Sequence, residues 1–68
     1  MSDEHALPRV PGDRQFIEAR TRHRRDRPAL LTEYACRWHE AAAAEPVPHR
    51  RANAGRRAAN AWLREVTQ

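Results

Sequence analysis

Lysine is absent from this 68-residue sequence, so arginine alone supplies its 13 basic side chains, against nine acidic residues and a net charge of +4. Cysteine occurs once, which excludes an internal disulfide and favours a reducing, cytoplasmic setting. The first residues are polar and acidic and do not resemble a signal peptide. No apolar run approaches the roughly 18 residues of a transmembrane helix, so we expect no membrane partner.

Large apolar side chains are also scarce, although hydrophobic residues make up 40% of the sequence. Thirteen of these residues are alanine, which favours helix but buries little surface. A single domain of this size has a small core and is marginally stable as a monomer. We therefore expect the chain to form a homo-oligomer or to bind a larger protein.

Prolines and helix-capping residues divide the chain into an irregular N-terminal arm, 1–12, and a single small helical domain, 13–68. Asp13 and Asp26 are suited to cap helix N-termini, and Pro28 is suited to a first turn. A Pro-Val-Pro segment later ends one helix and lets the next begin. We expect an all-α fold, with a short N-terminal helix and an antiparallel helical hairpin, and with helices at about 14–25, 27–45 and 48–66.

Apolar residues recur at spacings of three and four along both long helices, which is typical of helix faces that pack together. Gly55 inside a helix costs about 1 kcal/mol relative to alanine, so its presence indicates a close approach by a second helix. We expect the two tryptophans to pack in this seam rather than to stack on bases. The predicted seam, for the core or for a partner, consists of Leu31, Tyr34, Trp38, Ala52, Gly55, Ala59, Trp62 and Val66.

Two short stretches hold most of the arginines. Residues 20–27 contain five arginines and one acid, and residues 50–57 contain four arginines and no acid. Charge clustered in this way is typical of a surface that faces phosphates or acidic side chains. Nucleic acid is the commonest partner of this kind, and an acidic protein surface is the main competitor.

One face of the last helix combines arginine with asparagine, because Arg50, Arg57 and Arg64 lie opposite the seam with Asn53 and Asn60 beside them. These residue types bind phosphates and base edges. The arginines follow the flank of the helix, which favours sequence-tolerant backbone contact over helix-turn-helix recognition. The predicted contacts to nucleic acid, DNA in the first place, are Arg20, Arg22, Arg24, Arg25, Arg50, Arg51, Arg57 and Arg64.

Two alternatives fit the same sequence. In the first alternative, the hairpin is a protein–protein interaction module that completes its core by docking on a larger acidic protein. The apolar seam, rather than the arginines, would then carry the function. The chain also fits a small regulator such as an antitoxin.

Residues that could carry catalysis are few. Glycine occurs twice, which is too little for a glycine-rich phosphate loop. Arg37 lies between Glu33 and Glu40, which favours ion pairing over acid–base catalysis. Cys36, expected to be half-buried, and His39 lie one turn apart but supply only two metal ligands. We therefore expect no enzyme, no catalytic residue, no metal site and no cofactor.

The segment PALLTEYACRWHEAAAA, followed by PHRRANA and ANAWLRE, resembles the first two core helices of phage terminase small subunits. A leucine pair, a tyrosine and a tryptophan on one helical face, ahead of an alanine-rich end, carry the resemblance, which spans residues 28–65. It implies an α-helical DNA-packaging subunit of phage or mobile-element origin that forms a ring and binds viral DNA.

Overall fold

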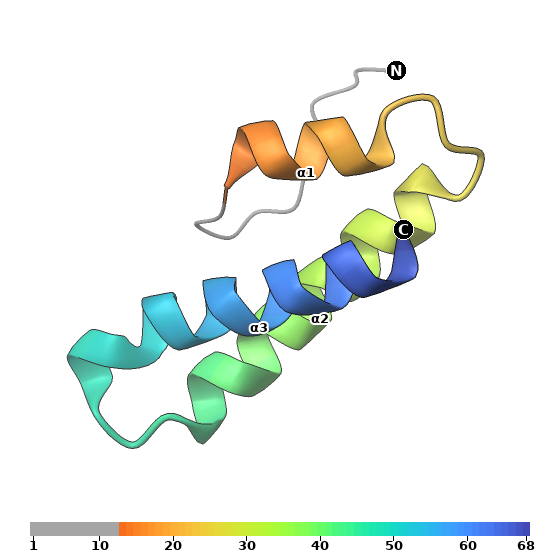
Figure 1. The fold of residues 1–68 in the computed structure, drawn as a ribbon. Helices are drawn as coiled ribbons and strands as arrows, with labels where there is room; N and C mark the ends of the chain where they lie inside the picture. The colour runs from red at the N-terminus through yellow and green to blue at the C-terminus, as the bar shows by residue number, and fades with distance from the viewer. Residues whose placement is uncertain (1–12) are drawn as a thin grey trace.

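The computed structural model describes residues 13–68 and confirms the predicted all-α fold. Helix α1 spans Arg14–Thr21, α2 spans Arg27–Ala44 and α3 spans Arg51–Val66, with the one-turn 3-10 helix η2 at Pro48–Arg50 directly before α3. The long helices α2 and α3 form the antiparallel hairpin, and α1 packs beside α3 (Figure 1). The predicted N-terminal arm, 1–12, lies outside the described residues.

Helix α1 begins as the sequence predicts but ends earlier. The Asp13 side chain accepts a hydrogen bond from the Phe16 backbone N–H at 3.1 Å, which caps the first turn. The predicted end near residue 25 is wrong, because the helix stops at Thr21. Arg22 takes an extended backbone (φ −56°, ψ 131°), and His23 lies in the left-handed region at φ 65°. These two residues turn the chain toward α2.

Helix α2 keeps the predicted start, with Pro28 in its first turn, where a missing N–H leaves no intrahelical bond unmade. Asp26 occupies the N-cap position, but its side chain makes no capping hydrogen bond. Glu45 ends the helix with an extended backbone directly ahead of the proline-containing turn. In that turn the Glu45 carboxylate accepts a hydrogen bond from the Val47 N–H at 3.2 Å.

Gly55 marks the closest approach of α3 to α2, as the sequence predicts. A Cβ atom at this position would lie 2.6 Å from Trp38 Cδ2 and 2.7 Å from the Trp38 backbone oxygen. These distances are far inside van der Waals contact, so only glycine lets the two helices meet here without a shift. The indole of Trp38 fills the space that the missing side chain leaves.

The core lies between the two long helices and receives one large side chain from α1. Its buried members are Ile17, Leu30, Leu31, Tyr34, Trp38, Ala42, Ala59 and Leu63. Tyr34 is fully buried and donates its hydroxyl hydrogen bond to Asn60 Oδ1 at 2.6 Å, which satisfies both polar groups at the helix–helix interface. Burial raises the pKa of the Tyr34 hydroxyl, so it remains a donor at neutral pH.

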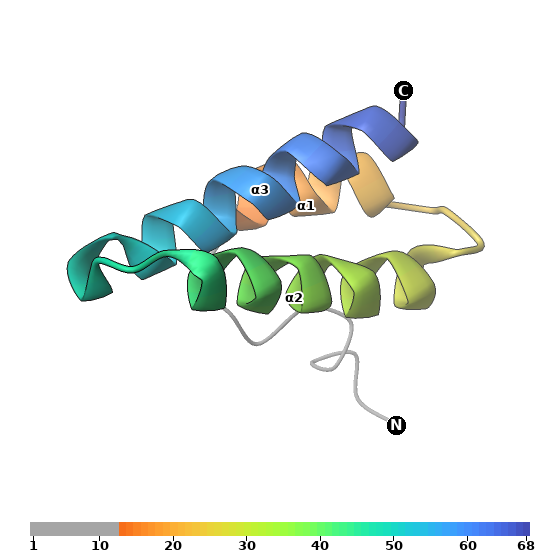
Figure 2. The same ribbon diagram turned by 90° about the horizontal axis from the view of Figure 1, so that it is seen from below.

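The residues predicted for the seam are buried in the middle of the hairpin, but two of them, at its ends, are exposed. Leu31, Tyr34, Trp38, Gly55 and Ala59 are buried, and Trp62 is half-buried. Ala52 and Val66, by contrast, are exposed, Val66 to 43%. Ala52 lies in the first turn of α3, and the last four residues of α2 are alanine; Figure 2 shows α3 rising away from α2 toward the C-terminus. Helical spacing correctly predicts which side of each helix faces the other, but it does not predict how far along the helix the contact extends.

Candidate nucleic-acid interface

The two arginine stretches lie toward opposite ends of the molecule. Residues 20–27, the first arginine stretch, cover the end of α1, the linker to α2 and the start of α2. Residues 50–57, the second arginine stretch, cover the end of η2 and the first half of α3, next to the turn between α2 and α3. Figure 1 shows the linker and this turn at the two ends of the hairpin, in a molecule whose longest extent is 36 Å.

Two arginines of the first stretch are neutralised by acids. Arg24 holds the Asp26 carboxylate with bonds of 2.9 and 3.2 Å, and the contact lowers the pKa of that carboxyl. Arg27 reaches back to α1, where it binds Glu18 at 2.7 Å and the Thr21 hydroxyl at 3.3 Å. The positions of these two guanidinium groups are therefore fixed by the protein's own carboxylates.

The remaining arginines of the first stretch differ from one another. Arg22 and Arg25 are exposed, and their side chains have no hydrogen-bond or ion-pair partner within residues 13–68. Arg20 is half-buried, and its Cζ atom lies 5.5 Å from the centre of the Phe16 ring. Arg64 of α3 approaches the same ring to 5.2 Å, so the end of α3 is joined to α1 through Phe16.

The second arginine stretch makes only neutral contacts. Arg51 Nε donates to the Glu45 backbone oxygen at 2.9 Å, and Arg56 donates to Asn53 Oδ1 at 2.7 Å. Arg50 and Arg57 are exposed, with no such partner in the described part of the chain. Within residues 13–68, none of these arginines forms an ion pair, so the charge of this stretch is uncompensated.

The asparagines predicted to flank the arginine face both use their side-chain oxygens as acceptors within the chain. Asn60 faces the hairpin interface, where its oxygen accepts the Tyr34 hydroxyl. Asn53 binds Arg56 on the same helix. The expectation that Asn60 lies beside Arg57 and Arg64 on an outward face is wrong, because its side chain completes the polar contact of a buried tyrosine.

The outward side of α2 has a mixed charge. Arg37 binds Glu33 at 2.9 Å, the i,i+4 pair that the sequence predicts, and its Cζ lies 5.1 Å from the centre of the Trp62 ring. Glu40 is exposed on the same helix. The uncompensated cations therefore belong to α1, its linker, η2 and α3.

Two exposed arginines that form no ion pair within residues 13–68 were not in the predicted site. Arg14 opens α1, and Arg56 lies within the second stretch. Arg14, Glu18 and Arg22 are spaced by four residues, so a search for basic residues at helical spacing would have found Arg14. The sequence prediction concentrated on runs of arginine and overlooked this longer spacing.

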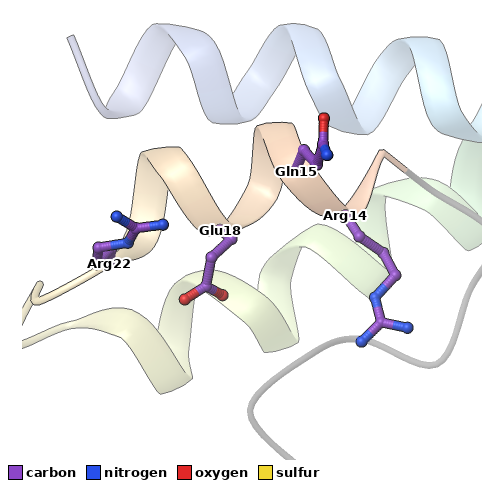
Figure 3. A pocket seen from close by; sticks show the side chains of 4 residues that line it. All are labelled: Arg14, Gln15, Glu18 and Arg22. Carbon is purple, nitrogen blue, oxygen red and sulfur yellow. The ribbon is translucent and has the colours of Figure 1, made fainter.

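Two shallow hollows lie among these cations. The larger, of about 510 Å³, is lined by Arg14, Gln15, Glu18 and Arg22. In Figure 3 the Arg14 and Glu18 side chains point away from α3, Gln15 points toward α3, and Arg22 lies just beyond the end of α1. The other, of about 410 Å³, is lined by the paired Arg24 and Asp26 and by Arg25. Both hollows are open and cationic, which suits contact with an extended anion.

Cys36 and His39, the two residues considered for metal binding, are both exposed on α2. Cys36 is exposed rather than half-buried, because it points away from the face of α2 that Trp38 buries. His39 packs edge-on against the Trp38 ring at 5.3 Å between ring centres. Across residues 13–68, no three His, Cys, Asp or Glu side chains gather as a metal site would require. Over the same range, no helix is long and apolar enough to cross a membrane.

Comparisons with protein-family models, with curated proteins and with solved structures found no match to this chain. The resemblance of residues 28–65 to phage terminase small subunits therefore stays a prediction.

Proposed function

We propose that this protein binds nucleic acid, DNA in the first place, through sequence-tolerant contacts to the phosphate backbone. The observation that carries the proposal is the distribution of compensated and uncompensated arginines. Within residues 13–68, only Arg24, Arg27 and Arg37 form ion pairs, and the remaining arginines are concentrated on α1, its linker and the η2–α3 segment. A guanidinium without its own carboxylate is available to a phosphate.

Backbone contact is favoured over base readout by the state of the polar side chains. Direct readout of adenine uses the amide of asparagine or glutamine, and both asparagines of α3 already have their side-chain oxygens hydrogen-bonded to other residues of the chain. The exposed groups are guanidinium forks, which match phosphate geometry. The expected binding mode is therefore tolerant of sequence and sensitive to salt.

A gel-shift or fluorescence-anisotropy titration of a mixed-sequence duplex over a salt series tests the proposal. Each neutralised phosphate contributes a slope of about −0.9 to the plot of log affinity against log salt concentration. We expect a slope of about −3 to −5, with little difference between unrelated duplex sequences. Absent binding, or an affinity that does not change with salt, would refute the proposal.

A protein partner is the second candidate function, and the exposed Val66 favours it. Val66 lies one turn beyond the half-buried Trp62 at the divergent end of the hairpin, so a partner could extend the core there. On this proposal, Trp62→Ala abolishes the complex with an acidic protein and the double variant Arg50→Ala/Arg57→Ala only weakens it. The reverse ranking, measured on duplex DNA, favours the nucleic-acid proposal.

The size of the core supports self-association or binding to a larger protein as part of either function. The buried hydrophobic cluster includes two alanines and draws one residue from α1. A chain this small usually gains stability from a further source, and a second protein surface is one. Light scattering on the full chain, with and without duplex DNA, measures the oligomeric state directly.

A further inference from the structure

Phe16 is the point at which cationic side chains from two helices meet. The Cζ atoms of Arg20 and Arg64 lie 5.5 and 5.2 Å from the centre of its ring, one from α1 and one from α3. Because both distances are measured to the same point, the two Cζ atoms lie no more than about 11 Å from each other. The ring itself is half-buried and packs against the core, so it is a fixed support for both.

The local structure around Phe16 holds this arrangement in place. The Asp13 cap fixes the Phe16 backbone at 3.1 Å, and the next residue, Ile17, is buried in the core. Arg20 follows Phe16 by four residues, which puts the two side chains on one face of α1. On α3, Arg64 directly follows the fully buried Leu63, so the helix cannot rotate without disturbing the core.

Contact with the ring leaves most of the hydrogen-bond donors of both arginines available. A guanidinium has five N–H donors, and an aromatic face attracts the cation without offering a lone pair. Arg20 uses one donor, toward the Thr67 backbone oxygen at 3.5 Å. The Arg64 guanidinium makes no hydrogen bond or ion pair within residues 13–68, and Arg64 is exposed. Neither guanidinium is neutralised by a carboxylate of the described chain.

We propose that Phe16, Arg20 and Arg64, together the Phe16 site, bind a backbone phosphate of nucleic acid in a preorganised position. The inference rests on the proposed function and adds to it the place where one phosphate is held most tightly. The aromatic contact restricts the rotamers of two flexible side chains before the ligand arrives, so less side-chain entropy is lost on binding. Phe16 is a positioning residue, because it acts through the two arginines.

Lysine substitutions test the site without changing net charge. Arg64→Lys and Arg20→Lys keep a cation but lose the planar fork and weaken the contact with the ring. We expect each to lower the affinity for duplex DNA about three- to tenfold at fixed salt, with the salt slope unchanged. Arg25→Lys is the matched comparison, since Arg25 is another proposed phosphate contact but is exposed and contacts no ring, and we expect it to lose less affinity than either of these variants.

Substitutions of Phe16 test the positioning role. Phe16→Tyr keeps the ring and should retain the affinity of the original chain. Phe16→Leu removes the ring but no charge, so the affinity should fall about threefold or more with the salt slope unchanged. In the Phe16→Leu background, Arg64→Lys should reduce the affinity for duplex DNA no more than Arg25→Lys does. Circular dichroism checks helix content, and the lysine variants decide the question if Phe16→Leu does not fold.

The outcomes separate this site from the wider proposal. If the original chain binds DNA with a steep salt slope, but Arg20→Lys and Arg64→Lys behave like Arg25→Lys, the Phe16 site is overturned and backbone binding stands. If the original chain does not bind DNA, both proposals fail. An NMR titration with inorganic phosphate alone should leave the Arg64 Nε–H signal unsaturated at millimolar concentration. Saturation there would assign the site to a free anion and overturn the backbone proposal for it.

Discussion

The two arginine stretches look alike in the sequence and differ in the folded chain. In residues 20–27, Arg24 and Arg27 are held by Asp26 and Glu18, and Arg20 lies against Phe16. In residues 50–57, no arginine pairs with a carboxylate of the described chain. One stretch therefore uses much of its charge to join α1, the linker and α2, whereas the charge of the other is uncompensated within residues 13–68.

The difference teaches that charge counted along a sequence is not charge available at a surface. Glu18 lies outside the first stretch, yet it neutralises Arg27 across nine positions of the chain. The neutral oxygens of Glu45 and Asn53 orient Arg51 and Arg56 without cancelling their charge. Short-range charge sums miss both effects, because each depends on which residues the fold brings together.

The largest effect is expected where the helix that carries the second stretch meets α2. Gly55→Ala raises helix propensity by about 1 kcal/mol, yet we expect a net loss of about 2 kcal/mol in the free energy of unfolding. The new Cβ would lie 2.6 Å from the Trp38 ring and 2.7 Å from a backbone oxygen, so the helices must separate. Thermal denaturation followed by circular dichroism measures the change.

The control for this variant is Ala58→Gly, at an exposed position of the same helix. It should lose about 1 kcal/mol, as propensity alone dictates. If Gly55→Ala were more stable than the original chain, the helices α2 and α3 would have space for the added methyl group. The position of the second stretch on α3 would then not depend on this close contact.

Features set by local sequence were predictable, and features set by distant partners were not. The Asp13 cap, the Pro28 start and the Gly55 approach follow from rules about single positions. The end of α1 at Thr21 does not follow from such rules, because it goes with the contacts that the Arg27 side chain makes to Glu18 and Thr21.

The candidate site divides in the same way. The second arginine stretch could be found by counting residues, and its four arginines are exposed. Counting residues could not predict that Asn60 accepts a hydrogen bond at the hairpin interface, because its partner Tyr34 lies 26 positions earlier. The meeting of Arg20 and Arg64 at Phe16 also needs the packing of α1 on α3, and no local pattern in the sequence indicates it.

Charge-conserving double variants compare the two stretches directly. Arg57→Gln/Glu65→Gln removes an uncompensated arginine and an exposed acid, and Arg24→Gln/Asp26→Asn removes an ion pair. Both keep the net charge. We expect the first to lower DNA affinity severalfold and to reduce the salt slope by about 1, and the second to change neither. Anisotropy titrations over a salt series measure both quantities.

The double variant Arg50→Gln/Arg57→Gln gives the upper limit of this effect. Because this variant leaves two phosphates without a guanidinium, the slope should fall by about 2 and the affinity about tenfold or more at physiological salt. Equal reductions in affinity for the two charge-conserving variants would mean that paired and unpaired arginines contribute alike, and the comparison between the stretches would not hold.

A smaller effect is expected on stability when the ion pair that joins α1 to α2 is broken. Glu18→Gln should reduce the free energy of unfolding by about 0.5 to 1 kcal/mol, since the pair is only partly shielded from solvent. For a chain of this size that corresponds to roughly 3–6 °C in Tm. Glu40→Gln, at an exposed acid with no ion pair in the described chain, is the control and should leave Tm unchanged.

The smallest effect concerns Asp26, whose carboxyl has a lowered pKa because Arg24 donates hydrogen bonds to it. A lowered pKa keeps the carboxylate charged at neutral pH, and the contact is lost only as the pH falls through that lowered value. Arg24→Gln should raise the Asp26 pKa toward its ordinary value of about 3.9, as carboxyl NMR titration would show.

Arg22→Gln is the matched control, because Arg22 makes no contact with Asp26, and it should leave the Asp26 titration where it is. If Arg24→Gln left the Asp26 pKa unchanged, Arg24 would count with Arg22 and Arg25 among the uncompensated cations. In the expected case, acidification below the lowered pKa releases Arg24. The first stretch then presents three exposed, unpaired arginines, Arg22, Arg24 and Arg25. The two stretches therefore differ less in unpaired charge in acid than they do at neutral pH.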